Sequence, residues 1–157
     1  MLSKKIISVT KGIKNNIIKK YNINENKIKV ISNGANTNLF KKIPKKEACH
    51  SIGLDSSYEY IGFVGNLVRW QGVDFLIESS KNIIKKYSKV KFLIVGSGVE
   101  EERLKNLTKK YKVSSYFIFT GDIPYKNVYK YINCCDIMIT LKRPLESGYS
   151  PLKLYEY

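Results

Sequence analysis

The sequence predicts an α/β fold, in which a Rossmann-like parallel sheet carries helices on both faces. From residue 60 onward, short apolar runs alternate with segments whose apolar residues recur at helical spacing. The runs at residues 60–65 and 91–96 are apolar almost throughout, and each ends in glycine. Strands of this kind are typical of a sheet that is buried on both faces, and a helix between successive strands favours parallel order.

The elements before residue 60 follow the same alternation less clearly. Ile13, Ile17 and Ile18 have helical spacing, and two short apolar runs flank them. The segment around Pro44 is polar and irregular, so we expect a linker there. The predicted strand, helix, strand and linker are residues 5–10, 11–21, 27–32 and 35–53.

After the linker, the sequence predicts four strands and three intervening helices. In parallel α/β sheets ligands bind at the carboxyl ends of the strands. Gly65, Gly96 and Gly121 stand at three such ends. The predicted strands are residues 60–65, 91–96, 116–121 and 136–140, and the predicted helices are residues 73–87, 100–111 and 125–133.

The last ten residues predict an anion-binding corner. A glycine-led turn begins at Gly148, and Pro151 is expected at the first position of a helix. The free N–H groups of such a helix start attract a phosphate. Glu156 would lie in the second turn, within reach of a sugar hydroxyl.

The composition favours anionic partners. The net charge is +15, from 28 Lys and Arg against 13 Asp and Glu. The lysines are scattered in pairs along the chain, which favours a solvated surface over a nucleic-acid-binding face. We therefore expect no nucleic-acid partner, although a phosphorylated ligand or an acidic membrane surface fits the charge.

The cysteine pattern predicts a reduced, cytoplasmic protein. Cys49, Cys134 and Cys135 form no disulfide framework and no metal-ligand cluster. Cys134 and Cys135 are expected to be small buried apolar residues. No signal peptide or transmembrane stretch is recognisable, and we expect His50 to be a surface residue rather than a base.

Two strand-end loops are candidates for phosphate contact. Gly96-Ser97-Gly98 resembles part of a dinucleotide fingerprint but lacks the third glycine. The loop at residues 65–72 is bracketed by glycines and holds Arg69, which is either a ligand contact or a solvated side chain. No nucleophile, general base, paired carboxylates or metal cluster can be assembled, so the catalytic residues stay unknown.

Taken in order, these segments resemble the retaining glycosyltransferase family 4, whose enzymes have the GT-B fold. The family pattern combines an Asn-Gly turn, glycine loops, a Phe-x-Gly strand end, an Asp-bearing strand and a turn into a helix with Glu. The corresponding segments are residues 30–36, 65–74, 96–98, 119–121, 135–137 and 150–157. The resemblance covers essentially the whole chain.

The resemblance implies a domain organisation and a set of donor contacts. Residues 1–43 would be the remnant of an acceptor domain and the interdomain crossing, and residues 44–157 a truncated GT-B C-terminal domain. Glu156 would bind the ribose hydroxyls of the donor, and the loop at residues 121–123 would lie beside the nucleobase. The expected donor-binding residues are Gly65, Asn66, Arg69, Gln71, Gly121, Ile123, Ser150, Pro151, Leu152, Lys153 and Glu156.

Three positions depart from the family pattern. Neutral Asn66 and Gln71 replace a diphosphate-binding arginine and lysine, and Gly148 replaces the earlier glutamate of a paired motif. Each lost charge-assisted contact is worth roughly 1.5–3 kcal/mol. Arg69 or Lys153 is the hypothesised compensating cation.

The resemblance therefore implies a retaining glycosyltransferase that acts in polysaccharide biosynthesis. The donor would be a UDP- or GDP-sugar, a substrate rather than a cofactor, and we expect neither cofactor nor metal. A glycan or lipid-linked acceptor would bind a missing N-terminal domain, so the fragment alone is expected to be inactive. The protein would be cytoplasmic or peripheral on the inner membrane face. The alternatives are a non-catalytic nucleotide-binding module or an inactive truncated remnant, then a dinucleotide oxidoreductase, then a nucleic-acid binder.

Overall fold

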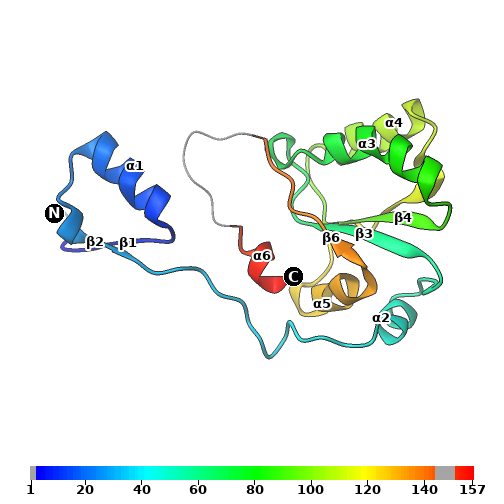
Figure 1. The fold of residues 1–157 in the computed structure, drawn as a ribbon, viewed down its shortest axis with the longest axis horizontal. Coiled ribbons are helices and arrows are strands. Elements are labelled where there is room, and N and C mark those ends of the chain that lie inside the picture. The colour runs from blue at the N-terminus through cyan, green and yellow to red at the C-terminus, as the bar shows by residue number, and fades with distance from the viewer. Residues whose placement is uncertain (1–2, 144–150) are drawn as a thin grey trace. The chain divides into compact units, whose positions relative to one another are not determined.

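The computed structural model describes residues 3–143 and 151–157 (Figure 1). These residues form two compact units. One unit comprises Thr37–Arg143 with Tyr157, and the other comprises the remaining described residues. In chain order the elements are β1 (Ile6–Ser8), α1 (Lys11–Tyr21), η1 (Glu25–Lys27), β2 (Ile28–Val30), α2 (Lys45–Ser51), β3 (Glu59–Val64), η2 (Arg69–Gln71), α3 (Val73–Lys86), β4 (Val90–Val95), α4 (Glu101–Lys110), η3 (Ser114–Tyr116), β5 (Phe117–Phe119), α5 (Tyr125–Cys134), β6 (Ile137–Met138) and α6 (Lys153–Glu156).

The larger unit is built on a parallel sheet with the strand order β5-β4-β3-β6. β3 and β4 pair over their whole length, from Glu59 opposite Val90 to Val64 opposite Val95. Within this unit, α3 and α4 cover one face of the sheet, and α2 and α5 cover the other (Figure 1). The predicted fold class is thus confirmed.

β4 explains why an uninterrupted apolar run forms a strand here. Successive residues of a strand point to opposite faces. Phe92 and Ile94 accordingly pack in one core cluster, while Leu93 and Val95 pack in a second one on the other face. The first cluster includes a stacked pair, Phe92 and Phe117, with ring centroids 4.6 Å apart.

Asp136 and Gly62 dock the short edge strand β6 onto β3. One carboxylate oxygen of Asp136 accepts hydrogen bonds from the backbone N–H of Tyr60 at 2.8 Å and from Lys45 Nζ at 2.6 Å. A side chain at Gly62 would collide with the sulfur atoms of Cys135 and Met138. The bare backbone at this position therefore lets the sulfur-bearing segment lie close to β3.

Helix α2 corrects the prediction of a linker over residues 35–53. Ala48 and Cys49 are fully buried within it, and both belong to the second core cluster. The helix is only two turns long, and its two small buried residues follow Lys45, Lys46 and Glu47, so the sequence shows little periodicity. His50 lies on the exposed side of the helix, as expected.

The structure also corrects the expectation that the cysteines form no disulfide. Cys49 on α2 and Cys134 at the end of α5 are joined by a disulfide, with their Cα atoms 5.0 Å apart. The two residues are 85 positions apart, and only the packing of α2 against α5 brings them together. Cys134 is fully buried, as predicted, and Cys135 is a partly buried free thiol.

The other unit contains the first two strands and the helix between them. β1 and β2 pair in parallel, with Ile6 opposite Ile28. Thr10 caps α1, because its hydroxyl oxygen accepts a hydrogen bond from the N–H of Ile13 at 3.1 Å. The predicted strand, helix and strand are all present, with shorter strands than expected.

Helix α6 begins at Lys153, two residues later than predicted. Pro151 precedes the helix and accepts a hydrogen bond from the N–H of Leu154 at 3.2 Å. A tight turn thus replaces the first helical turn that the proline suggested. Gly148 and the rest of the predicted glycine turn lie outside the described residues. Over the described ranges, every helix is too short or too polar to cross a membrane.

Candidate functional site

A hollow of about 410 Å³ opens where β3, β4 and β5 end. Because the strands are parallel, their carboxyl ends meet at one edge of the sheet, and three loops converge there. Its wall consists of backbone groups, the polar side chains of Asn66 and Ser97, the carboxylate of Asp122 and aliphatic side chains. The lining residues are Val64, Gly65, Asn66, Val95, Gly96, Ser97, Asp122, Ile123 and Val128.

Glycines let the loop after β4 approach the loop after β3. Gly96 has φ +121°, and a side chain there would collide with the carbonyl oxygen of Gly65. At Gly98, with φ +156°, the collision would be with the carbonyl oxygen of Leu67. Loop packing therefore accounts for both glycines of Gly96-Ser97-Gly98.

Backbone hydrogen bonds fix the three loops relative to one another. The N–H of Leu67 donates to the carbonyl of Ser97 at 2.7 Å, and the N–H of Gly96 donates to the carbonyl of Gly121 at 3.0 Å. The hydroxyl of Tyr157 accepts from the N–H of Val64 at 3.2 Å. Two backbone hydrogen bonds and one bond to the Tyr157 side chain therefore hold the strand ends around the hollow.

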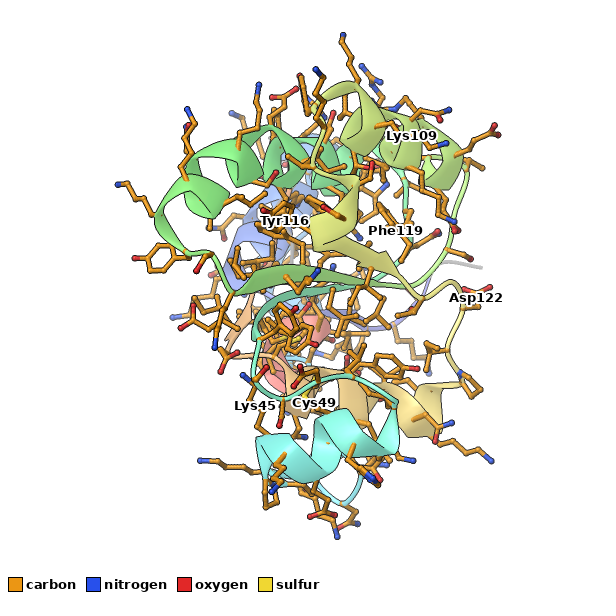
Figure 2. The ribbon with its side chains drawn as sticks, turned by 90° about the vertical axis from the view of Figure 1, so that its right-hand side faces the viewer. Lys45, Cys49, Lys109, Tyr116, Phe119 and Asp122 are labelled. Atoms are coloured by element: carbon orange, nitrogen blue, oxygen red, sulfur yellow. A yellow bond between two sulfur atoms is a disulfide. The ribbon has the colours of Figure 1, made fainter. Side chains whose placement is uncertain are left out.

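Ser97 and Asp122 form a polar pair on the wall of the hollow. The hydroxyl of Ser97 donates to Oδ1 of Asp122 at 2.7 Å, which joins the loops after β4 and β5. Figure 2 shows Asp122 on the loop that leaves β5, away from helix α2 with Lys45 and Cys49. Asp122 is exposed and is the charged member of the lining set.

The loop that carries Arg69 is held from the segment after β6. The backbone N–H of Arg143 donates to the carbonyl of Trp70 at 2.9 Å, and its Nε donates to the carbonyl of Arg69 at 3.2 Å. The Arg143 guanidinium also lies 4.3 Å from the ring centroid of Phe75 and pairs with Asp74.

The hollow brings together part of the predicted donor-binding set. Gly65, Asn66 and Ile123 line it, and Gly121 contacts the lining residue Gly96 through the backbone. Arg69 is exposed in the adjoining loop.

Gln71 is placed differently from what the resemblance suggests. Its exposure is 5%, and it lies in the one-turn helix η2 rather than on the wall of the hollow. Gly72 follows with φ +71° and starts α3. Because it is buried, the Gln71 side chain belongs to the packed interior of the loop.

The C-terminal members of the predicted set belong to the other unit, apart from Ser150, which lies outside the described residues. Pro151 and Leu152 precede α6, and Lys153 and Glu156 are its first and last residues. Burial lowers the pKa of Lys153 to about 8, while the neighbouring Glu156 carboxylate acts in the opposite direction. Their role in donor binding stays a prediction.

The predicted donor-binding set did not include Ser97, Asp122 or Val128, although Ser97 and Asp122 belong to loops that the sequence identified as candidates. Ser97 stands between two glycines and Asp122 follows Gly121, so their positions after strand ends were the available indication. Val128 lies on the buried side of α5, where an apolar residue indicates only packing.

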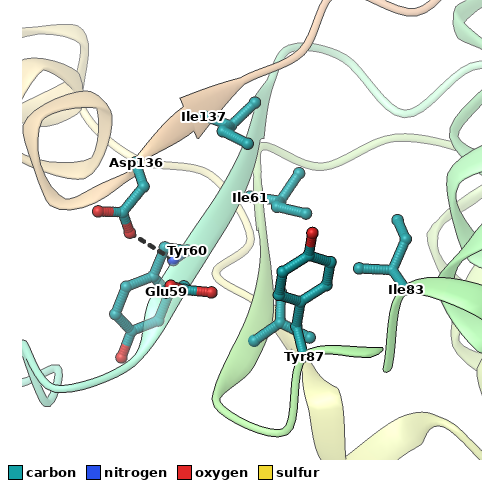
Figure 3. Close-up of a pocket in the computed structure, with 8 residues that line it drawn as sticks. Glu59, Tyr60, Ile61, Ile83, Tyr87, Asp136 and Ile137 are labelled. Carbon is teal, nitrogen blue, oxygen red and sulfur yellow. Dashed lines mark hydrogen bonds between the residues drawn. The ribbon is translucent and has the colours of Figure 1, made fainter. Parts of the chain in front are cut away.

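A second hollow, of about 450 Å³, lies at the opposite ends of the strands (Figure 3). Glu59 and Val90, the first residues of β3 and β4, line it, together with the side chains of Ile61, Tyr87 and Ile137. Amino ends of parallel strands lack the convergent loops of a ligand site. We therefore assign the functional site to the first hollow.

Within the described ranges, no three His, Cys, Asp or Glu residues cluster as metal ligands would.

Comparison with protein families gives one match that covers most of the chain. The family described as "Glycosyl transferases group 1" matches residues 44–154. An uncharacterized glycosyltransferase of Methanocaldococcus jannaschii is 28% identical over 138 residues, which cover 85% of this chain and 35% of the relative. The Staphylococcus aureus capsular polysaccharide biosynthesis glycosyltransferase CapM is 34% identical over 98 residues, covering 59% of this chain and 25% of CapM.

Solved structures show the same fold. A glycosyltransferase from Rickettsia africae has a TM-score of 0.75 at 23% identity, covering 88% of this chain and 38% of that chain. Anabaena HepE, solved in complex with UDP, has a TM-score of 0.75 at 18% identity. The match covers 90% of this chain and 39% of the HepE chain. These likenesses support the expected GT-B fold. The chain spans about a third of the length of the M. jannaschii relative.

Proposed function

Since the chain belongs to the group 1 glycosyltransferase family, we propose that the first hollow binds a nucleotide-diphosphate sugar. The observation that carries this proposal is the position of the hollow at the carboxyl ends of three parallel strands. Its volume of about 410 Å³ suits a small ligand, and neighbouring backbone groups and Asn66 offer polar contacts. HepE, solved with UDP, provides a fold-level analogy.

The reaction we propose is transfer of the sugar to a glycan or lipid-linked acceptor with retention of configuration. An acceptor hydroxyl attacks C1 of the donor sugar, and the nucleoside diphosphate leaves. The role of CapM in capsular polysaccharide biosynthesis supports an acceptor of this class. Because this chain spans about a third of the M. jannaschii relative, acceptor contacts are proposed for sequence outside these 157 residues, and the 157 residues alone are expected to be inactive.

Positive charge near the leaving diphosphate is proposed to come from Arg69 or Lys153. Asn66 and Gln71 are neutral, and Gln71 is buried, so neither supplies it. The Arg69 side chain is exposed, three positions after Asn66, and carries a guanidinium group that suits a phosphate. Lys153, with its pKa lowered to about 8, remains mostly protonated at neutral pH.

Binding by the full-length protein tests the proposed donor site. Calorimetric titration with UDP and with GDP is expected to show binding of at least one nucleotide. Asn66→Ala is expected to weaken it about 3- to 10-fold, the worth of a neutral hydrogen bond. Asn106→Ala, at an exposed asparagine on α4, is the matched control and should leave binding unchanged. Absence of binding by both nucleotides would contradict the proposal.

A transfer assay separates the enzyme from a non-catalytic nucleotide-binding module. The full-length protein is incubated with the nucleotide-sugar of the base it binds, and release of the nucleoside diphosphate is followed. Release that depends on a glycan or lipid-linked acceptor supports a transferase. Tight binding without release would favour the binding module.

The charge of +15 supports a peripheral position at an anionic membrane surface on the cytoplasmic side. We expect the full-length protein to cosediment with vesicles that contain acidic lipid and not with neutral vesicles. Equal sedimentation with both would contradict this localisation.

A further inference from the structure

We propose that Asp122, held in place by Ser97, selects guanine as the base of the donor, so that the substrate is a GDP-sugar. The inference rests on the proposed function, because it assigns a base to the nucleotide that the hollow is proposed to bind. It concerns two side chains on the wall of that hollow, Ser97 and Asp122.

The Ser97 hydroxyl fixes the orientation of the Asp122 carboxylate. It donates to Oδ1 at 2.7 Å and so links two loops. The same loops are joined by the backbone hydrogen bond from the N–H of Gly96 to the carbonyl of Gly121. Over residues 3–143 and 151–157, this is the one hydrogen bond or ion pair of the Asp122 side chain, and Oδ2 keeps no polar partner. The carboxylate is therefore oriented and still has free acceptor positions.

A carboxylate on the wall excludes the diphosphate from its vicinity. Two negative charges repel at short distance, so the phosphate groups lie elsewhere in the site. Asp122 consequently faces the nucleoside part of the donor. Asp122 lies directly after Gly121, in the loop between β5 and α5.

Guanine matches a carboxylate better than uracil does. Guanine presents two adjacent donors, N1–H and N2–H, which pair with the two oxygens of one carboxylate, and charge-assisted bidentate pairs of this kind are strong. In uracil the N3–H lies between two carbonyl oxygens, and a carboxylate repels both. The Ser97 hydroxyl, whose hydrogen goes to Asp122, keeps its oxygen lone pairs as further acceptors beside the carboxylate.

The test is calorimetric titration of the full-length protein with GDP and UDP. The wild-type protein is expected to bind GDP about 10- to 100-fold more tightly than UDP, the worth of one to two charge-assisted hydrogen bonds. Asp122→Asn should weaken GDP binding by about the same factor, because the amide presents an N–H to a donor edge, and should leave UDP binding unchanged or tighter. Ser97→Ala should weaken GDP binding by a smaller factor and spare UDP.

The control variant is Glu102→Gln, which removes the same charge from an exposed position on α4. It should change neither affinity, and this would show that the effect of Asp122→Asn does not come from net charge. A variant that folds is recognised by an unchanged thermal melting temperature, and Ser97→Ala gives an independent readout beside Asp122→Asn.

Three results would overturn the inference. Tighter binding of UDP than of GDP by the wild-type protein would refute guanine selection while supporting the nucleotide site. An equal loss for both nucleotides in Asp122→Asn would place the carboxylate at the ribose, which both share. Binding of neither nucleotide would refute the proposed function as well.

Discussion

Asp74 Oδ2 and Arg143 Nη2 form an ion pair at 2.5 Å that joins the first turn of α3 to the segment after β6. The Asp74 side chain is 10% exposed, and the same oxygen lies 3.5 Å from Arg103 Nη2. Since Arg143 also donates to the carbonyls of Arg69 and Trp70, the pair holds the loop next to the candidate donor site. Asp74 thus acts on the site through Arg143.

Asp74→Asn is expected to lower the free energy of unfolding by about 1–2 kcal/mol. The substitution keeps the shape of the side chain but leaves two arginines without their shared anion. Both arginines are about a third exposed, so water screens part of the loss. Urea denaturation measures the change.

The control for Asp74→Asn is Glu101→Gln, which breaks an exposed pair between Glu101 and Lys105. Such a surface pair on a helix is worth less than about 0.5 kcal/mol. If Asp74→Asn lowers the free energy of unfolding no more than Glu101→Gln, the network around Asp74 does not stabilise the loop.

Gly96→Ala is expected to destabilise the protein more than Gly53→Ala. Both glycines have positive φ, +121° and +71°, so alanine is strained at either position, by about 1 kcal/mol. Only at Gly96 does the new methyl group collide with backbone, at the carbonyl of Gly65, while Gly53 has open space around it. The collision forces the two loops apart and adds about 1–3 kcal/mol.

Thermal unfolding of both variants gives the comparison, because their difference isolates the steric contribution from the backbone strain. Nucleotide affinity of the full-length Gly96→Ala variant should fall as well, since Gly96 lines the candidate site. Equal melting temperatures for the two variants would show that the loops after β3 and β4 separate freely.

The larger part of the fold was predictable because its strands are buried on both faces. A run such as Phe92 to Val95 supplies both core clusters, so it needs no polar alternation, and the flanking helices keep clear apolar spacing. Helix α2 was missed because its apolar contribution consists of two small residues, Ala48 and Cys49, in a short and otherwise polar helix. The pattern that identifies a helix is weak when so few residues are buried.

The sequence could predict the position of the candidate site at the strand ends, but not the contacts within it. Gly65 and Gly121 indicated where the loops meet, but pairings across loops, such as Ser97 with Asp122, depend on how the turns are packed. The burial of Gln71 and the disulfide between Cys49 and Cys134 likewise arise from tertiary contacts between distant segments. Local patterns carry no information on such contacts.

The Cys49–Cys134 disulfide is expected to stabilise the larger unit. It closes a sequence separation of 85 residues, and restricting an unfolded chain over such a length contributes roughly 2–4 kcal/mol. Reduction should therefore lower the urea midpoint of the wild-type protein and leave that of Cys49→Ser unchanged. Peptide mapping without reduction should recover the two cysteines in one linked fragment, and separate fragments would contradict the bond.

Cys135 is expected to be an unreactive thiol in the folded protein. Burial raises its pKa to about 12, and the neighbouring Asp136 carboxylate acts in the same direction. Relative to the ordinary thiol value of 9.0, a shift of this size lowers the thiolate fraction near pH 8 about 1000-fold. Alkylation by iodoacetamide should be slower by about that factor in the folded chain than in urea.

The raised pKa of Cys135 also fixes the sign of its effect on stability. Above about pH 9 the unfolded chain loses the thiol proton while the folded chain keeps it, so the unfolded state is favoured as the pH rises. Wild-type protein should therefore lose more stability between about pH 9 and pH 11 than Cys135→Ser, which has no proton to lose there. Parallel losses in the two proteins, measured by urea denaturation, would show that the thiol is not held protonated by the fold.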